Sequence, residues 1–366
     1  MAFIESVSLL LPAPRATTAE EVASAPDWRA VCECPHGSPA EMAICVGRAA
    51  LAVTASQASD IGWIVHCGSG YQGSPGWPVH HHIQQGIIGR HGNAFELRQY
   101  CAGGLTSWVL ADPMTNSGKA VMCTAADNWS WGDRFVSSRS VGGEPFSDVA
   151  HAAVISPRSG FARILGTATA SCPDQSEPWR TREAFWEHAD RGDFRAAYQR
   201  AVGGRTAEQN RDSFCMMVSA VMTALTETGL SPQYVTHFVP HSSTSGQPYR
   251  SVAEAVGLPW SESLHQRNLD HGYLGVSAEV AGLVDLAESS ALRKDSIVLL
   301  LAAEYQLSAT AVILAITESP IVSGDGLVRT AARAPPTSTK SAPSSSSTSI
   351  SSAGSTAGSS CPTRSC

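Results

Sequence analysis

The sequence has little charge and few aromatic residues. Asp, Glu, Lys and Arg together make up 16% of its 366 residues, and Phe, Trp and Tyr make up 7%. The 32 acidic residues outnumber the 25 basic ones, and Lys and Arg form no run of the kind that follows a phosphate backbone. This balance argues against nucleic acid as a partner.

Long apolar runs are also lacking. The most apolar stretch, Ile297–Ile316, is interrupted by Glu304, Gln306 and Ser308, so it is not the span of about 18 uninterrupted apolar residues that a membrane helix needs. Near the N-terminus, Glu5 stands where a secretion signal carries positive charge. We therefore expect a soluble, cytoplasmic protein with no membrane partner, in which the cysteines stay reduced.

Metal-binding patterns are weak. One residue separates Cys32 from Cys34, whereas zinc-binding thiols are usually separated by two to four. The run His80–His82 has suitable side chains but no second cluster to complete a site, which favours surface or dimer-contact histidines. We predict no metal site and no resident cofactor.

The sequence does contain the pattern of a large α/β protein. Hydrophobic residues make up 43% of it, and short apolar runs such as Ile61–Cys67 alternate with helical periodicity such as that of Ser38–Ala55 and Asp212–Thr228. We expect a first half over residues 1–170, a bridging segment over 171–211 and a second half over 212–319. Residues 320–366, rich in Ser, Thr, Ala and Pro towards the end, are expected to form a disordered tail.

Cys101 lies where a strand pattern ends and a helix pattern begins, in QYCAGGL. A thiol at a helix N-terminus faces the positive end of the peptide dipoles, which favours the nucleophilic thiolate. The glycines allow close approach to another backbone. The alternative is a buried cysteine that acts only as a small hydrophobic residue.

His241 ends an apolar strand pattern, in FVPHSS. The carboxyl ends of strands form the rim where α/β sheets usually bind ligands, so this imidazole is a candidate acid–base group for Cys101 or for an acyl acceptor. The alternative is a structural histidine with satisfied hydrogen bonds.

Taken together, QYCAGGL and FVPHSS resemble the ketoacyl-ACP synthase III family and its acyltransferase relatives from polyketide biosynthesis. The resemblance extends over roughly residues 3 to 317 and includes AADNWSWGDRF at Ala125–Phe135 and PFSDVAHAAVIS at Pro145–Ser156. It implies a thiolase-like fold of two pseudo-equivalent α/β halves in αβαβα layers, and a homodimer. It also implies that Cys101 takes the acyl group and that His241 faces it.

The segment His271–Glu279, HGYLGVSAE, departs from the family pattern. Condensing members have an Asn in G-N-T-S-A, where this chain has Gly275. Acyltransferase relatives have G-H-x-G-x-S-D, where this chain has Tyr273 for the His and Ala278 for the Asp. Glu279, His271 or Asp270 could substitute as a third catalytic residue, although the ordinary interpretation of Glu279 as a solvated helix residue is favoured.

The turn between the last two predicted strands departs as well. The family's turn is rich in glycine and lends an N–H group to the oxyanion hole, whereas Ala302–Ser308 here reads AAEYQLS. Glu304 either places a carboxylate near the active site or points outward. The N–H of Cys101 remains available as one oxyanion donor.

These features predict an acyltransferase that takes an acyl group from acyl-CoA or an acyl carrier protein as a thioester on Cys101. A hydroxyl, an amine or a carrier thiol would then accept it, in polyketide or other secondary metabolism. Decarboxylative condensation is the second possibility, and the missing Asn weakens it because the enolate needs stabilisation. A non-catalytic partner that binds acyl carriers is the third.

Overall fold

The computed structural model describes residues 1–19, 21, 27–74, 76–130, 134, 145–179, 197–241, 246–304, 307–323 and 327–329. The middle of the predicted bridging segment and nearly all of the predicted tail lie outside these residues.

The first half of the chain forms one group of strands in the order β5-β4-β6-β7-β1. Strands β5, β4 and β6 are parallel, and β7 runs antiparallel to both β6 and β1. Their bounds are Phe3–Leu10 (β1), Ile61–Cys67 (β4), Asn93–Leu97 (β5), Ala120–Asp127 (β6) and Val149–Ser156 (β7). Strands β6 and β7 are buried along their whole length, which explains why they read as continuous runs of small and apolar residues.

The second half repeats this plan in the order β8-β11-β10-β9. Strands β9 and β10 are parallel, and β11 runs antiparallel to β10 and β8. Their bounds are Ala162–Ser171 (β8), His237–Pro240 (β9), Ile297–Glu304 (β10) and Ser308–Ile316 (β11). The two groups join through a short pairing of β1 with β8 at Phe3 and Ile4.

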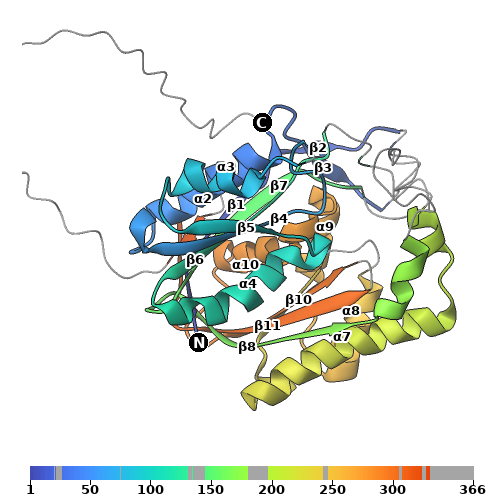
Figure 1. The fold of residues 1–366 in the computed structure, drawn as a ribbon. Helices are drawn as coiled ribbons and strands as arrows, with labels where there is room; N and C mark the ends of the chain where they lie inside the picture. Colours follow the sequence, from blue (N-terminus) through green and yellow to red (C-terminus); the bar gives the residue numbers. More distant parts are fainter. Residues whose placement is uncertain are drawn as a thin grey trace, which may run out of the picture.

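Helices fill the layers around and between these sheets (Figure 1). Helices α2 and α3 cover the outer face of the first sheet, and α7 and α8 lie along the second. Helices α4 and α10 lie between the two sheets, and every residue of α10 from Ala278 to Ala287 is buried. The helix bounds are Pro39–Ala52 (α2), Val79–Ile87 (α3), Gly103–Met114 (α4), Ala207–Thr228 (α7), Gln247–Val256 (α8), Glu262–His271 (α9) and Ala278–Glu288 (α10).

This arrangement confirms the predicted fold of two similar α/β halves in five layers. The largest hydrophobic core lies between the sheets and includes Leu105 and Trp108 of α4, Leu283 of α10 and Leu300 of β10. This shared core contains residues of both halves, and the segment Gly275–Ser277 (η7), which precedes α10, contacts both α4 and the turn before it.

Several elements differ from the sequence prediction. The tail was expected to begin at residue 320, but Ile321–Ser323 (β12) and Leu327–Arg329 (β13) form a hairpin whose second strand pairs with β1. Strand β8 was not predicted, since Thr and Ser interrupt its apolar pattern. The histidine run at His80–His82 lies in helix α3, which was not predicted either.

Candidate active site

Cys101 lies in a 3-10 turn, Tyr100–Ala102 (η2), that leads directly into α4. Its side chain is a free thiol with 4% of its surface exposed. The preceding residue, Tyr100, has a φ angle of 41°, a left-handed conformation that costs energy for a residue with a side chain. The chain therefore turns sharply from β5 into the helix, and the thiol is held at the helix N-terminus.

Gly104 explains how α4 comes so close to the second half. A Cβ atom added there would lie 2.1 Å from the carbonyl oxygen of Val276 and 2.9 Å from the ring of His151. Only a residue without a side chain allows this approach. The second glycine of AGGL thus seats the helix of Cys101 against the segment Gly275–Ser277 (η7).

His241 follows the last residue of β9, and its backbone N–H donates to the carbonyl of Leu301 at 2.8 Å. The side chain is 3% exposed. Cys101 lies close enough to the imidazole to act on its pKa, so the structure brings together the two residues that the motifs singled out.

Glu279 is buried, with 1% of its surface exposed, so the favoured interpretation of it as a solvated residue was wrong. Its Oε1 atom lies 2.5 Å from Nδ1 of His241. A carboxylate can only accept a hydrogen bond, so Nδ1 carries a proton and donates it. The error arose because α10 is enclosed between two sheets and has no solvated face.

Burial alone would lower the pKa of His241, but Glu279 and Cys101 outweigh this effect and raise it to about 10. The imidazole is therefore protonated at neutral pH. A positive charge beside Cys101 stabilises its thiolate, and the carboxylate behind it stabilises the imidazolium.

The other two candidates for a third residue lie elsewhere. Asp270 forms an ion pair with Arg29 at the surface, and its side chain is half exposed. The backbone carbonyl of His271 accepts a hydrogen bond from Ser147 Oγ at 2.5 Å. Both residues belong to the end of α9 and stabilise its connection to the first half, so of the three only Glu279 contacts His241.

Tyr273 was noted in the sequence only as a departure from the acyltransferase pattern, and no role was predicted for it. Its hydroxyl lies 2.7 Å from Nε2 of His241. The two ring nitrogens of His241 are thus held by Glu279 on one side and Tyr273 on the other. The departure itself was the available signal, but only the fold shows that the phenol reaches the imidazole.

Gly275, at the position of the condensing enzymes' Asn, has a φ angle of 45°. A Cβ atom there would lie 3.0 Å from Oδ2 of Asp127 and 3.5 Å from Oγ of Ser69. A side chain at this position would therefore meet Asp127 at close distance.

Asp127 is a buried carboxylate at the end of β6 that the sequence analysis did not single out. Its Oδ1 accepts hydrogen bonds from the backbone N–H groups of Ser69 at 2.7 Å and Gly70 at 2.9 Å. Burial raises the pKa of Asp127 to about 6, although these hydrogen bonds oppose the shift. Asp127 thereby holds the loop whose Ser69 hydroxyl lies 3.7 Å from the sulfur of Cys101.

Glu304 does not simply point outward. Its carboxylate accepts a hydrogen bond from Nε2 of Gln99 at 2.5 Å and another from Oγ of Ser308 at 2.8 Å. Gln99 precedes Cys101 by two residues. The turn that provides glycine backbone in the family therefore provides a half-buried carboxylate near the start of α4 here.

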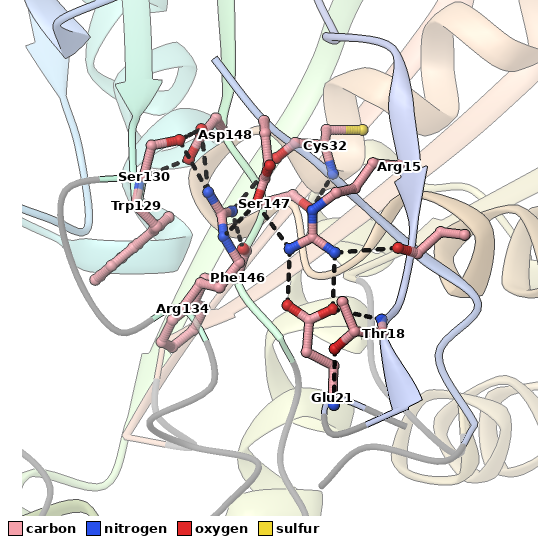
Figure 2. A network of polar contacts seen from close by, with 12 residues as sticks. Arg15, Thr18, Glu21, Cys32, Trp129, Ser130, Arg134, Phe146, Ser147 and Asp148 are labelled. Carbon is pink, nitrogen blue, oxygen red and sulfur yellow. Dashed lines mark hydrogen bonds and ion pairs between the residues drawn. The ribbon is translucent and has the colours of Figure 1, made fainter. Parts of the chain in front are cut away.

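Ser147 and Asp148 belong to the network of polar contacts shown in Figure 2. Ser147 accepts from the backbone N–H of Cys32 at 3.0 Å, and its own N–H donates to the carbonyl of Tyr273 at 3.0 Å. The neighbouring Asp148 is fully buried and pairs with Arg134. The network joins strand β3 (Ala30–Cys32) to the segments before β7 and after α9.

The described part of the chain contains no group of three or more His, Cys, Asp or Glu side chains arranged to hold a metal ion. The backbone N–H of Cys34 donates to Oδ2 of Asp148 at 2.7 Å. His82 lies 3.1 Å from Glu41 at the surface. Among the same residues, none of the helices has both the length and the apolarity to cross a bilayer.

No known family profile and no curated protein sequence matches the chain. Solved structures do share its fold. The acyltransferase ChlB3 superposes with a TM-score of 0.76 at 22% identity, over 87% of this chain and 98% of that one. The priming β-ketosynthase of the R1128 polyketide pathway superposes with a TM-score of 0.68 at 19% identity, over 87% of this chain and 97% of that one. The 3-oxoacyl-acyl-carrier-protein synthase III of Aquifex aeolicus superposes with a TM-score of 0.67 at 18% identity, over 86% of this chain and 100% of that one.

The chain therefore has the thiolase-like fold. Its particular form is the one found in type III ketoacyl synthases and in the acyltransferase ChlB3.

Proposed function

We propose that this protein is an acyltransferase that carries its acyl group as a thioester on Cys101. The observation that supports this most is the arrangement of the buried thiol, the imidazole of His241 and the carboxylate of Glu279, because it combines a nucleophile, a proton carrier and a charge that orients the carrier.

In the first half-reaction, the thiolate of Cys101 attacks the carbonyl carbon of an acyl thioester. The backbone N–H of Cys101, at the start of α4, is positioned in the chain to stabilise the oxyanion. When the tetrahedral intermediate collapses, the donor leaves as a thiolate, which then takes up the Nε2 proton of His241. The enzyme is then acylated, and His241 is neutral with its remaining proton on Nδ1, facing Glu279.

The charges around the site favour acyl transfer over decarboxylative condensation. Condensation requires a carboxylated extender and a donor for its enolate, and Gly275 provides no side chain at the position of that donor. Asp127 lies beside Gly275, and Glu304 accepts a hydrogen bond from Gln99, two residues before Cys101, so two carboxylates lie near the elements that carry the thiol. They would repel an anionic extender, whereas a neutral hydroxyl or an amine meets no such penalty.

The donor in this proposal is an acyl-CoA or an acyl carrier protein. Both present the acyl group as a thioester on a phosphopantetheine arm, so the reaction needs no further cofactor. We also propose a homodimer in the cytoplasm, acting in polyketide or related secondary metabolism. Sedimentation of the purified protein would test the dimer.

The test is the intact mass of the protein after incubation with acetyl- to octanoyl-CoA and with the corresponding acyl carrier proteins. The proposal predicts an added acyl mass that is absent in Cys101→Ala. Failure of every donor to add mass would instead favour a non-catalytic protein that binds acyl carriers. Carbon dioxide released from malonyl carrier by the acylated protein would favour the condensing enzyme.

A further inference from the structure

We propose that Tyr273 is a catalytic residue of the second half-reaction, in which its hydroxyl relays a proton from the acceptor to His241. This inference rests on the proposed acyl transfer through Cys101 and deepens it, because it assigns the group that activates the acceptor. The acceptor class that fits is one whose attacking atom carries a proton to be removed, such as an alcohol or water.

The hydrogen bonds of His241 leave little choice for proton transfer. Glu279 holds Nδ1 at 2.5 Å, and the hydroxyl of Tyr273 holds Nε2 at 2.7 Å. After acylation, Nε2 is the ring atom that can accept a proton, and the phenol contacts it at 2.7 Å. Tyr273 thus offers a route by which a proton from the acceptor reaches His241.

Displacement of the phenol is opposed by the way Tyr273 is held. Its backbone N–H donates to the carbonyl of Pro145 at 2.8 Å, and its carbonyl accepts from the N–H of Ser147 at 3.0 Å. These two hydrogen bonds form a β-bridge with the segment before β7. Its ring packs at 5.5 Å from Phe146, which stacks at 4.4 Å on Trp129. Trp129, Phe146 and Ser147 all belong to the network in Figure 2.

The position of the phenol relative to Cys101 is also suitable. The ring of Tyr273 lies 3.9 Å from the place that a Cβ atom of Gly275 would take, and Ser69, which contacts the sulfur of Cys101, lies 3.5 Å from that same place. Tyr273, which contacts His241, and Ser69, which contacts the sulfur of Cys101, therefore both lie next to Gly275.

In the second half-reaction, two proton transfers accompany the attack of the acceptor. The acceptor oxygen attacks the thioester carbonyl carbon and gives its proton to the oxygen of Tyr273, while the phenolic proton moves to Nε2 of His241. The new carbon–oxygen bond forms as the carbon–sulfur bond breaks. Cys101 leaves as a thiolate beside a protonated imidazole, which restores the starting state of the enzyme.

The test separates the two half-reactions in the full-length protein. Wild type and Tyr273→Phe are first charged with the acyl-CoA that labels Cys101, and the unreacted acyl-CoA is removed. Loss of the acyl group is then followed by intact mass in water and in glycerol, which serve as acceptors. Tyr273→Phe is expected to charge within about threefold of the wild-type rate, because the donor can leave as a thiolate without a proton, but to lose the acyl group about 10²-fold more slowly, the usual contribution of a positioned proton-transfer group.

Two controls show whether the phenolic hydroxyl is the cause. Hydroxylamine, a strong nucleophile that depends less on proton removal, should cleave both acyl-enzymes at similar rates. Tyr249→Phe removes the hydroxyl of another buried tyrosine, whose ring centroid is 6.4 Å from that of His241, and should leave both half-reactions near wild type. Thermal unfolding of each variant verifies that it folds.

Equal rates of acyl loss in wild type and Tyr273→Phe would overturn the relay. So would an equal slowing of charging and of acyl loss, which would reduce Tyr273 to a residue that merely positions His241. Absence of any adduct in the wild type, in contrast, would contradict the proposed function itself.

Discussion

The carboxylate of Glu279 contacts Nδ1 of His241 at 2.5 Å, inside the layer between the two sheets. Glu279 is in the first turn of α10, where the helix dipole stabilises a negative charge. The second half of the chain thus supplies both the imidazole and the group that keeps it protonated, while the first half supplies the thiol.

Replacement of Glu279 by Gln should therefore slow acylation of Cys101. Without the carboxylate the pKa of His241 falls, and the imidazolium that stabilises the thiolate is lost. We expect about a 10²-fold decrease in the rate of charging by acyl-CoA, the size of effect that a single acid–base or charge-stabilising group provides. Glu288→Gln, at the exposed end of the same helix, is the matched control and should charge like wild type. A Glu279→Gln variant as fast as this control would exclude a role for the carboxylate.

Substitution of Gly275 by Ala should cost more stability than a left-handed backbone alone explains. Gly118 has a φ angle of 81° with nothing within 4 Å of an added Cβ, so Gly118→Ala measures the conformational cost, about 1 kcal/mol. Gly275→Ala adds a contact of 3.0 Å with Asp127. Urea unfolding should give a lower free energy of unfolding for Gly275→Ala than for Gly118→Ala. Equal free energies would show that Asp127 moves aside freely.

The close approach of α4 gives a similar comparison between adjacent glycines. An added Cβ at Gly104 would meet the carbonyl oxygen of Val276 at 2.1 Å, whereas at Gly103 it would meet the side chain of Cys67 at 3.1 Å. Gly104→Ala should therefore push the helix of Cys101 away from the second half and reduce acylation strongly, with a loss of several kcal/mol in stability. Gly103→Ala should be clearly milder in both measurements. The reverse order would contradict the packing described for η7.

Stability should decrease as the pH falls below about 6.5. Burial lowers the pKa of His66 to about 4 and that of His151 to about 3, whereas unfolded imidazoles bind protons near 6.5. The unfolded state thus binds more protons over this window, and acid favours it by roughly 1 kcal/mol per pH unit for each histidine. Asp127, whose pKa is raised to about 6, has the opposite sign and offsets part of the loss between pH 4 and 6.

Urea unfolding between pH 7.5 and 5 checks this dependence. Replacement of His66 by Gln should flatten the decrease, because one of the two buried imidazoles is gone. Replacement of the exposed His91 by Gln should not change it. A stability that is independent of pH in the wild type would mean that these imidazoles are protonated in the folded state.

Much of the fold could be predicted because its strands are short apolar runs with clear ends. The strand at Ile61–Cys67 was predicted with the bounds that the structure gives, and the helix predicted over Ser38–Ala55 spans Pro39–Ala52 with Ser38 as its N-cap. The strand expected over Tyr234–Val239 spans His237–Pro240, since Pro232–Tyr234 forms a 3-10 turn before it. These differences follow from local turn geometry that periodicity does not encode.

The proximity of Cys101 and His241 could be predicted because each lies at the end of a regular element in a distinctive motif. Glu279 could not be assigned, since its burial depends on the second sheet that closes over α10. Tyr273 could not be assigned either. Its direction depends on the bridge to Phe146 and on Gly272, whose backbone is left-handed at a φ of 76°.

The central claim is that Cys101 carries the acyl group between donor and acceptor. The most direct measurement is a pulse–chase with radiolabelled acyl-CoA, with the labelled residue located by peptide mapping and the chase made with an alcohol. The account predicts a label on Cys101 that forms at least as fast as overall turnover and passes to the alcohol. A label on another residue, or a label on Cys101 that the alcohol fails to remove, would contradict it.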